Sequence, residues 1–141
     1  VDSDGHGKVL DAAPILVEDN LAYDNDAAGL TVYATGNAHL RNNTIVNNDV
    51  ELKDKRPAPW SIHDLTIEGN FFKNAKIAAD GSSTSNYASR RYVIDGNTYD
   101  NAGGTIFNWN AKRYTSTSSV FGALGFEKKG RNGPVNVSLP V

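Results

Sequence analysis

Hydrophobic and polar residues alternate along this chain in units that recur about every 25 positions. Four segments share the order apolar, polar, small or Asx, then Asn: ILVEDNLAYDN from residue 15, AHLRNNTIVNN from 38, LTIEGNFFKN from 65 and YVIDGNTYDN from 92. The aligned asparagines Asn20, Asn43, Asn70 and Asn97 are separated by 23, 27 and 27 residues. A recurrence of this length is typical of a solenoid in which each unit forms one coil.

A second alternating run follows each of these segments, and the four runs occupy residues 29–34, 49–54, 75–81 and 103–109. Alternation with a period of two predicts β-strands. No helical pattern separates the runs, so the strands should be parallel and stacked coil on coil rather than joined by helical crossovers. A β-sandwich, in which Asn is simply a frequent turn residue, is the alternative interpretation of the same pattern.

The repeated asparagines predict a ladder at one corner of the coils. An Asn amide has both donors and an acceptor, so it can bond to its counterparts above and below. Asn also tolerates the left-handed backbone conformation that a sharp corner needs. A second asparagine closes each unit, at Asn25, Asn48, Asn74 and Asn101.

The two ends of the repeat differ. After Trp109 the pattern stops, and the segment TSTSSVFGALGFE places Val120, Phe121 and Leu124 at helical spacing behind Ser and Thr residues suited to capping. We expect a short helix or compact cap there, because the end of a solenoid otherwise exposes strand edges and core. Pro14 enters the first coil almost at once, so we expect missing N-terminal coils or a partner chain to cover the other end.

The fold expected for residues 1–141 is therefore a single all-β domain, a right-handed parallel β-helix of about four coils. Two or three strands form each coil, the coils occupy about 14–110, and a C-terminal cap occupies about 111–141. We interpret the chain as the C-terminal part of a longer protein. A net charge of −2 with no basic block does not favour nucleic-acid binding, no apolar stretch is long enough to span a bilayer, and zero cysteines exclude disulfides.

The apolar-x-[DG]-Asn repeats, ending in Asn108-Trp109-Asn110 and then a Tyr-Thr-Ser segment, resemble the C-terminal coils of bacterial right-handed β-helix proteins of the pectate-lyase-like polysaccharide lyase superfamily. The resemblance extends from Pro14 to about Glu127. It implies a secreted protein with a long groove for a polysaccharide along one sheet. It is weak for activity, because glycoside hydrolases, tailspikes and surface adhesins share such repeats.

The second strand of each coil supplies the candidate binding residues. If Leu30, Val32, Val50, Leu52, Ile77 and Ala79 point inward, the outward set is Thr31, Tyr33, Glu51, Lys53, Ala78, Asp80, Phe107 and Trp109. Exposed rings beside charges suit a sugar groove, since pyranose faces stack on aromatic rings. Tyr33, Glu51, Asp80, Phe107 and Trp109 are the predicted substrate-binding residues. For Phe107 and Trp109, packing beneath the terminal cap is an equally good interpretation.

A lyase acting on uronic acids abstracts the proton beside the carboxylate, which needs a base and a group that neutralises the acid, often Ca²⁺. Lys53 is the predicted base, and Arg56, Arg90 and Arg91 could lower its pKa, so Lys53 and Arg91 form the predicted catalytic pair. Glu51, Asp54 and Asp80 are the candidate calcium ligands.

Hydrolysis by paired carboxylates is the second hypothesis, with Glu51 and Asp80 as the pair, or two carboxylates from the first-strand row of Glu18, Glu68 and Asp95. A solenoid that only binds glycan, or serves as a surface or tailspike segment, is the third. Solvated surface charge is the simpler interpretation of all these charged residues.

Overall fold

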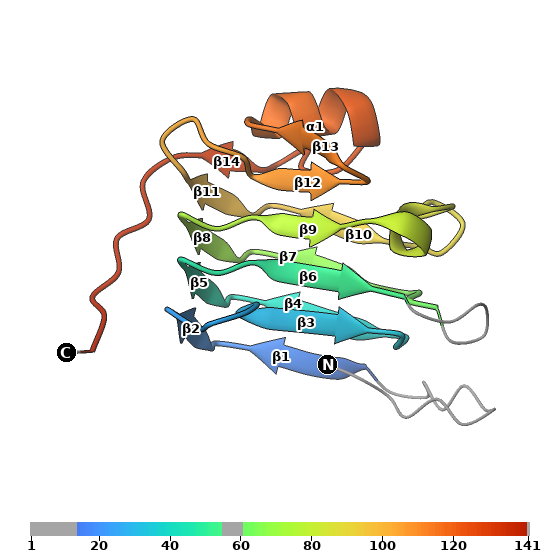
Figure 1. The fold of residues 1–141 in the computed structure, drawn as a ribbon, viewed down its shortest axis with the longest axis horizontal. Helices are drawn as coiled ribbons and strands as arrows, with labels where there is room; N and C mark the ends of the chain where they lie inside the picture. Colours follow the sequence, from blue (N-terminus) through green and yellow to red (C-terminus); the bar gives the residue numbers. More distant parts are fainter. Residues whose placement is uncertain (1–13, 55–60, 141) are drawn as a thin grey trace.

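The computed structural model describes residues 14–54 and 61–140 and shows an all-β solenoid with three sheets (Figure 1). Its first sheet contains β1 (Ile15–Glu18), β4 (Ala38–Arg41), β7 (Thr66–Glu68) and β10 (Val93–Asp95). The second contains β2 (Leu21–Tyr23), β5 (Thr44–Val46), β8 (Phe71–Lys73), β11 (Thr98–Asp100) and β14 (Arg131–Asn132). The third contains β3 (Leu30–Tyr33), β6 (Val50–Lys53), β9 (Ile77–Ala79), β12 (Phe107–Trp109) and β13 (Lys112–Tyr114).

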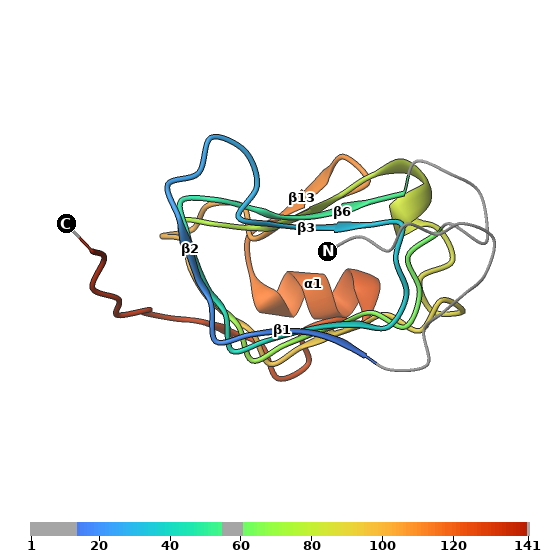
Figure 2. The same cartoon turned by 90° about the horizontal axis from the view of Figure 1, so that it is seen from below.

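Each coil runs through the three sheets in turn. In the view from the β1 end, the chain passes from β1 to β2 to β3 clockwise as it recedes, so the solenoid is right-handed (Figure 2). Strands of successive coils pair in parallel register, for example Val50 of β6 with Ile77 of β9. Three complete turns separate the four strands of the first sheet, so the solenoid makes about three turns, slightly fewer than the four coils expected.

The strands are short because each coil turns a corner after three or four residues. Their inward side chains stack in columns, and one column of the second sheet contains the fully buried Ile45, Phe72 and Tyr99. The rings of Phe72 and Tyr99 are stacked with centroids 4.8 Å apart. This stacking of like side chains along the axis is the reason that the apolar pattern repeats with the coil length.

The predicted asparagine ladder is present at the corner between the first and second sheets. The Oδ1 atom of Asn43 accepts from the backbone N and the Nδ2 of Asn20, at 3.1 and 3.0 Å. In the same way, Oδ1 of Asn70 accepts from the backbone N and the Nδ2 of Asn43, at 2.9 and 3.0 Å. Oδ1 of Asn97 accepts from the same two atoms of Asn70, at the same two distances. Asn43, Asn70 and Asn97 are at most 2% exposed, so these amides hold the coils together from inside the wall.

The sharp turn at this corner is made by the residue before each ladder asparagine. Asp19, Asn42, Gly69 and Gly96 have φ angles of 59°, 53°, 66° and 68°. The ladder asparagines are not among the residues with positive φ, so the expectation that they adopt the left-handed conformation was wrong. Gly and Asx residues occupy the preceding position because they tolerate that conformation best.

The closing asparagines do not form one row. Asn25 donates its backbone N–H to Oδ1 of Asn48 at 2.9 Å, whereas Asn74 donates from Nδ2 to Oδ1 of Asn47 at 2.9 Å. Asn74 is therefore aligned with the residue before Asn48. Asn101 bonds locally, from Nδ2 to the carbonyl of Thr105. The corner between the second and third sheets therefore contains two neighbouring rows of asparagines, one with Asn25 and Asn48 and one with Asn47 and Asn74.

A buried carboxylate ends the ladder of Asn20, Asn43, Asn70 and Asn97, which we call the inner ladder. Glu127 is 2% exposed, and its Oε1 accepts from the backbone N of Asn97 at 3.2 Å while its Oε2 accepts from the Asn97 Nδ2 at 2.9 Å. The Tyr99 hydroxyl also donates to Oε2. Glu127 therefore takes the place that the asparagine of a further coil would occupy.

The predicted cap contains the helix α1 (Thr117–Leu124), which closes the end of the solenoid above β12 (Figure 1). Ser116 is its N-cap, with Oγ accepting from Ser119 N at 3.2 Å, and Gly125 ends it with φ of 80°. Val120 is fully buried, whereas Phe121 is 45% exposed. The helix thus rests on the core through one narrow face.

Candidate functional site

The outer face of the third sheet carries the candidate site. Strand register places Glu51 of β6 beside Ala78 of β9, and Ala78 beside Asn108 of β12. The intervening inward residues Leu52 and Ala79 are 1% and 6% exposed. Because side chains alternate across a strand, Glu51, Ala78 and Asn108 form one outward row that runs along the solenoid axis.

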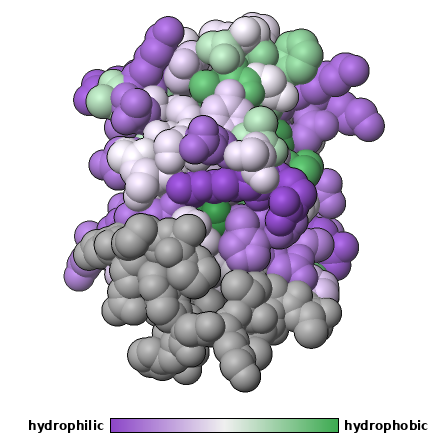
Figure 3. All heavy atoms as spheres, turned by 90° about the vertical axis from the view of Figure 1, so that its right-hand side faces the viewer, coloured by the Kyte–Doolittle hydropathy of each residue, from purple (hydrophilic) through white to green (hydrophobic). Residues whose placement is uncertain are grey.

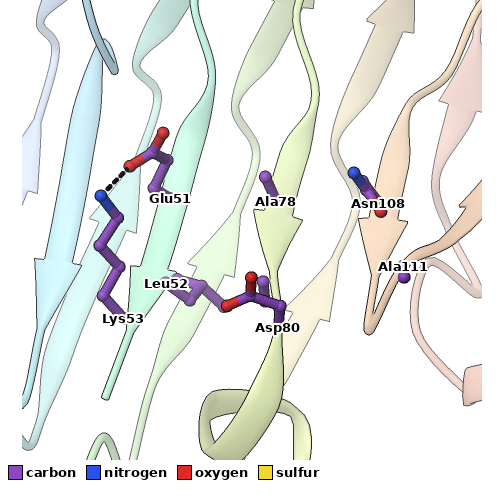
Figure 4. A pocket seen from close by; sticks show the side chains of 8 residues that line it. Glu51, Leu52, Lys53, Ala78, Asp80, Asn108 and Ala111 are labelled. Carbon is purple, nitrogen blue, oxygen red and sulfur yellow. Dashed lines mark ion pairs between the residues drawn. The ribbon is translucent and has the colours of Figure 1, made fainter. Parts of the chain in front are cut away.

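A hollow of about 250 Å³ opens above Ala78, because its methyl group lies between the larger polar side chains of Glu51 and Asn108 (Figure 4). Lys53 and Asp80 lie on one side of this row, and Ala111 belongs to the lining. We call this feature the Ala78 hollow. It is a concave, polar surface on a rigid sheet, which is the kind of place where a small polar ligand or one sugar unit can bind.

Lys53 is paired within the hollow. Its Nζ lies 2.8 Å from Oε2 of Glu51, and 47% of the Lys53 side chain is exposed. The hydrogen bond and the charge of Glu51 raise the pKa of Lys53 above its ordinary value, and the charge of Asp80 acts in the same direction. A lysine that acts as a general base needs the opposite shift. The geometry therefore does not favour the predicted role of Lys53 as a base.

Asp80 and Asn108 have side chains available for a ligand. Asp80 is exposed and precedes the 3-10 helix η1 (Gly81–Thr84), but its carboxylate makes no capping hydrogen bond to that helix. Within residues 14–54 and 61–140, neither the Asp80 carboxylate nor the Asn108 amide makes a side-chain hydrogen bond or a salt bridge. Both groups line the hollow, so an acceptor and an amide stand on its wall without a partner in this part of the chain.

Tyr33 lies one coil from the hollow. It is in register with Lys53 in the neighbouring strand and is half-buried. The outward placement predicted for Tyr33, Glu51 and Lys53 is therefore confirmed, while their roles in binding or catalysis remain predictions.

Phe107 and Trp109 do not face outward. They pair in register with the inward residues Ile77 and Ala79 and are 0% and 4% exposed. Their rings contact the ring of Phe126, with centroids 6.4 and 5.3 Å away, so they pack against the segment that follows α1. The groove interpretation of these two residues was wrong. Asn108 between them faces the hollow instead.

Arg91 lies elsewhere in the structure. Its guanidinium donates two hydrogen bonds to the carboxylate of Asp64, at 2.5 and 2.6 Å, and it does not line the hollow. The connection that contains Arg91 lies on the right-hand side in Figure 1. The coloured part of the face seen from that side carries many hydrophilic side chains, and most of its apolar atoms lie toward the capped end (Figure 3). The structure thus does not bring the predicted catalytic pair together. Arg56 lies outside the described residues.

Asp54 is unsuitable as a calcium ligand. Its side chain is 0% exposed, its Oδ2 lies 2.6 Å from the Arg90 guanidinium, and its Oδ1 accepts from the backbone N of Ile62. Among the residues that the structure describes, no group of three or more His, Asp or Glu side chains is placed to hold a metal ion. With Asp54 buried and Glu51 paired to Lys53, the residues proposed for Ca²⁺ do not fit it.

The residues that sequence reasoning missed in this hollow are Asn108 and Ala111. An outward Phe107 and Trp109, as the sequence predicts, would turn Asn108 inward, whereas the structure shows the opposite register. Only the fact that Phe107 and Trp109 are both large and apolar, with a polar residue between them, indicated the correct register.

Comparison of the chain with protein-family models, curated proteins and solved structures found no match. No helix in the described parts of the chain is long and apolar enough to cross a membrane. The strand pairing shows a parallel β-solenoid. The similarity to the pectate-lyase-like superfamily remains a resemblance in sequence pattern.

Proposed function

We propose that this chain is a carbohydrate-binding β-solenoid segment that holds one unit of a glycan chain in the Ala78 hollow. The observation that carries the proposal is the row in which Ala78 leaves a gap between Glu51 and Asn108. Sugar hydroxyls both donate and accept, so carboxylate and amide groups on one wall suit them.

Binding is favoured over elimination. The lyase hypothesis needs a lysine with a lowered pKa and a nearby cation, whereas Lys53 is paired with Glu51 and Arg91 is paired with Asp64. Polysaccharides of the kind that the resemblance implies lie outside the cell, so the proposal includes secretion.

Hydrolysis is the second candidate. Glu51 and Asp80 come from neighbouring coils and both line the hollow, which is the minimum arrangement for an acid and a base or nucleophile. Release of reducing ends from a bound polymer would favour this candidate over binding alone.

The test is calorimetric titration of the purified chain with oligosaccharides of neutral, amino and uronic sugars. Ala78→Phe fills the hollow on an outward strand position where an aromatic residue is well tolerated. Thr66→Phe is the matched control, because Thr66 is an outward, half-buried residue of β7 in the first sheet. We expect binding to at least one glycan that Ala78→Phe abolishes and Thr66→Phe retains. Absence of binding to all of them, or equal binding by both variants, would refute the proposal.

A further inference from the structure

The charges around the Ala78 hollow are unequal. Among the described residues that line it, Glu51 and Asp80 are acidic and Lys53 is basic. The exposed Arg113 of β13, in register with Asn108, is not part of this lining. Lys53 is already held 2.8 Å from Glu51. The Asp80 carboxylate makes no salt bridge with a described residue. Among the described residues, one negative charge of the lining therefore has no contact partner.

The two carboxylates flank the position that a ligand would occupy. Ala78 lies beside Glu51 in register, and Asp80 is two residues farther along the chain from Ala78. In a parallel sheet, strands about 4.8 Å apart with a rise of about 3.3 Å per residue place such diagonal neighbours about 8 Å apart. An ammonium group has three N–H donors, so a single one placed above Ala78 can approach both carboxylates and the carbonyl of the Asn108 amide.

From this geometry we infer that the hollow selects saccharides that carry a free, protonated amino group, such as the glucosamine units of a deacetylated glycan. The inference rests on the proposed carbohydrate-binding function and specifies the ligand of the same site. A uronate would instead bring its carboxylate next to Glu51 and Asp80 and be repelled.

Lys53 indicates how this environment acts on a cation. Glu51 and Asp80 both raise the pKa of Lys53, which means that they favour the charged form of an ammonium at this surface. A ligand amine would experience the same two carboxylates, together with the opposing charge of Lys53. The expected preference is moderate because the site is open to solvent, where an ion pair contributes up to about fivefold in affinity. Because Glu51 is already paired with Lys53, the contact with Asp80 sets this preference.

The test compares three oligosaccharides of equal length, made of glucosamine, N-acetylglucosamine or galacturonic acid, by titration at low and high salt. We expect the glucosamine oligomer to bind up to about fivefold more tightly than the N-acetylated one, with the difference shrinking as salt screens the charges. Asp80→Asn should remove most of the difference. Asp26→Asn, which makes the same charge change at an exposed residue outside the hollow, should retain it.

The possible results separate this inference from the proposed function. Equal binding of the glucosamine and N-acetylglucosamine oligomers, or tighter binding of the galacturonate, would overturn the amino-sugar preference and leave glycan binding intact. A preference that Asp80→Asn and Asp26→Asn reduce equally would also overturn it, since a general charge effect would then explain the data. Binding of none of the three would overturn the inference together with carbohydrate binding.

Discussion

Substitution of Glu127 tests whether a buried carboxylate terminates the asparagine ladder. Three donors point at this carboxylate: the backbone N and the Nδ2 of Asn97, and the hydroxyl of Tyr99. Asn97 and Tyr99 are 0% and 1% exposed, so Glu127→Ala would leave these donors buried without an acceptor. An unsatisfied buried donor costs about 1–3 kcal/mol, and water entering the vacated space would recover part of the total. We expect Glu127→Ala to lower the free energy of unfolding by about 3 kcal/mol.

Glu127→Gln should cost much less. Each ladder asparagine receives both donors of its neighbour on a single amide oxygen, as Asn70 does for Asn43. A Gln oxygen can serve Asn97 in the same way, and its amide N–H can donate to the Tyr99 hydroxyl. The expected loss is about 1 kcal/mol or less, because the variant also removes a buried charge.

The pH dependence gives a second measurement on the same residue. Burial is the largest influence on Glu127 and raises its pKa above the ordinary value. The folded state therefore keeps the proton to higher pH than the unfolded state does. The stabilisation that results is fully present below the ordinary glutamate pKa and is lost as pH rises through the folded-state pKa. Wild type should lose stability relative to Glu127→Gln from about pH 4 upward.

Urea unfolding followed by circular dichroism measures these differences, with Glu68→Ala as the control for loss of an exposed glutamate in β7. The reasoning would be refuted if Glu127→Ala were as stable as Glu68→Ala. It would also be refuted if wild type gained stability relative to Glu127→Gln as the pH rose from about 4 to 7.

Two further predictions concern stability. Asn70→Ala removes a buried amide that bonds to both neighbouring coils, and we expect it to lower the free energy of unfolding by about 2–4 kcal/mol in urea, whereas Asn74→Ala in the exposed row should cost under about 1 kcal/mol. Equal losses of unfolding free energy in the two variants would contradict the conclusion that the inner ladder contributes more to stability than the exposed row. Arg90→Ala leaves the buried Asp54 carboxylate unpaired and should cost about 3–5 kcal/mol by the same assay, clearly more than Arg91→Ala, whose guanidinium is exposed. A larger effect of Arg91→Ala on the melting temperature would argue against a structural role for Arg90.

Much of the fold was predictable from local pattern. The apolar positions recur once per coil because like side chains stack in columns, as Ile45, Phe72 and Tyr99 do. The ladder asparagines were identifiable because Asn43 and Asn70 each bond to the equivalent residue of the next coil, which forces the same residue to repeat. Because contacts between coils join equivalent positions, the tertiary contacts of a solenoid appear as a repeat in its sequence.

The end of the solenoid did not follow from the repeat. Phe107 and Trp109 were placed on the wrong side because a one-residue change of register moves every side chain of a strand to the opposite face. The role of Glu127 was also missed. It lies 30 residues from Asn97 and belongs to no repeat, so only the path of the chain around the cap reveals that it meets the ladder.

The candidate site shows the same division. The sequence by itself determined that Tyr33, Glu51 and Lys53 face outward, because alternation within a strand settles which side each residue takes. Only the tertiary structure decided which charges meet. The pairing of Lys53 with Glu51, and of Arg91 with Asp64, depends on side-chain directions and corner geometry between coils, which no local pattern encodes.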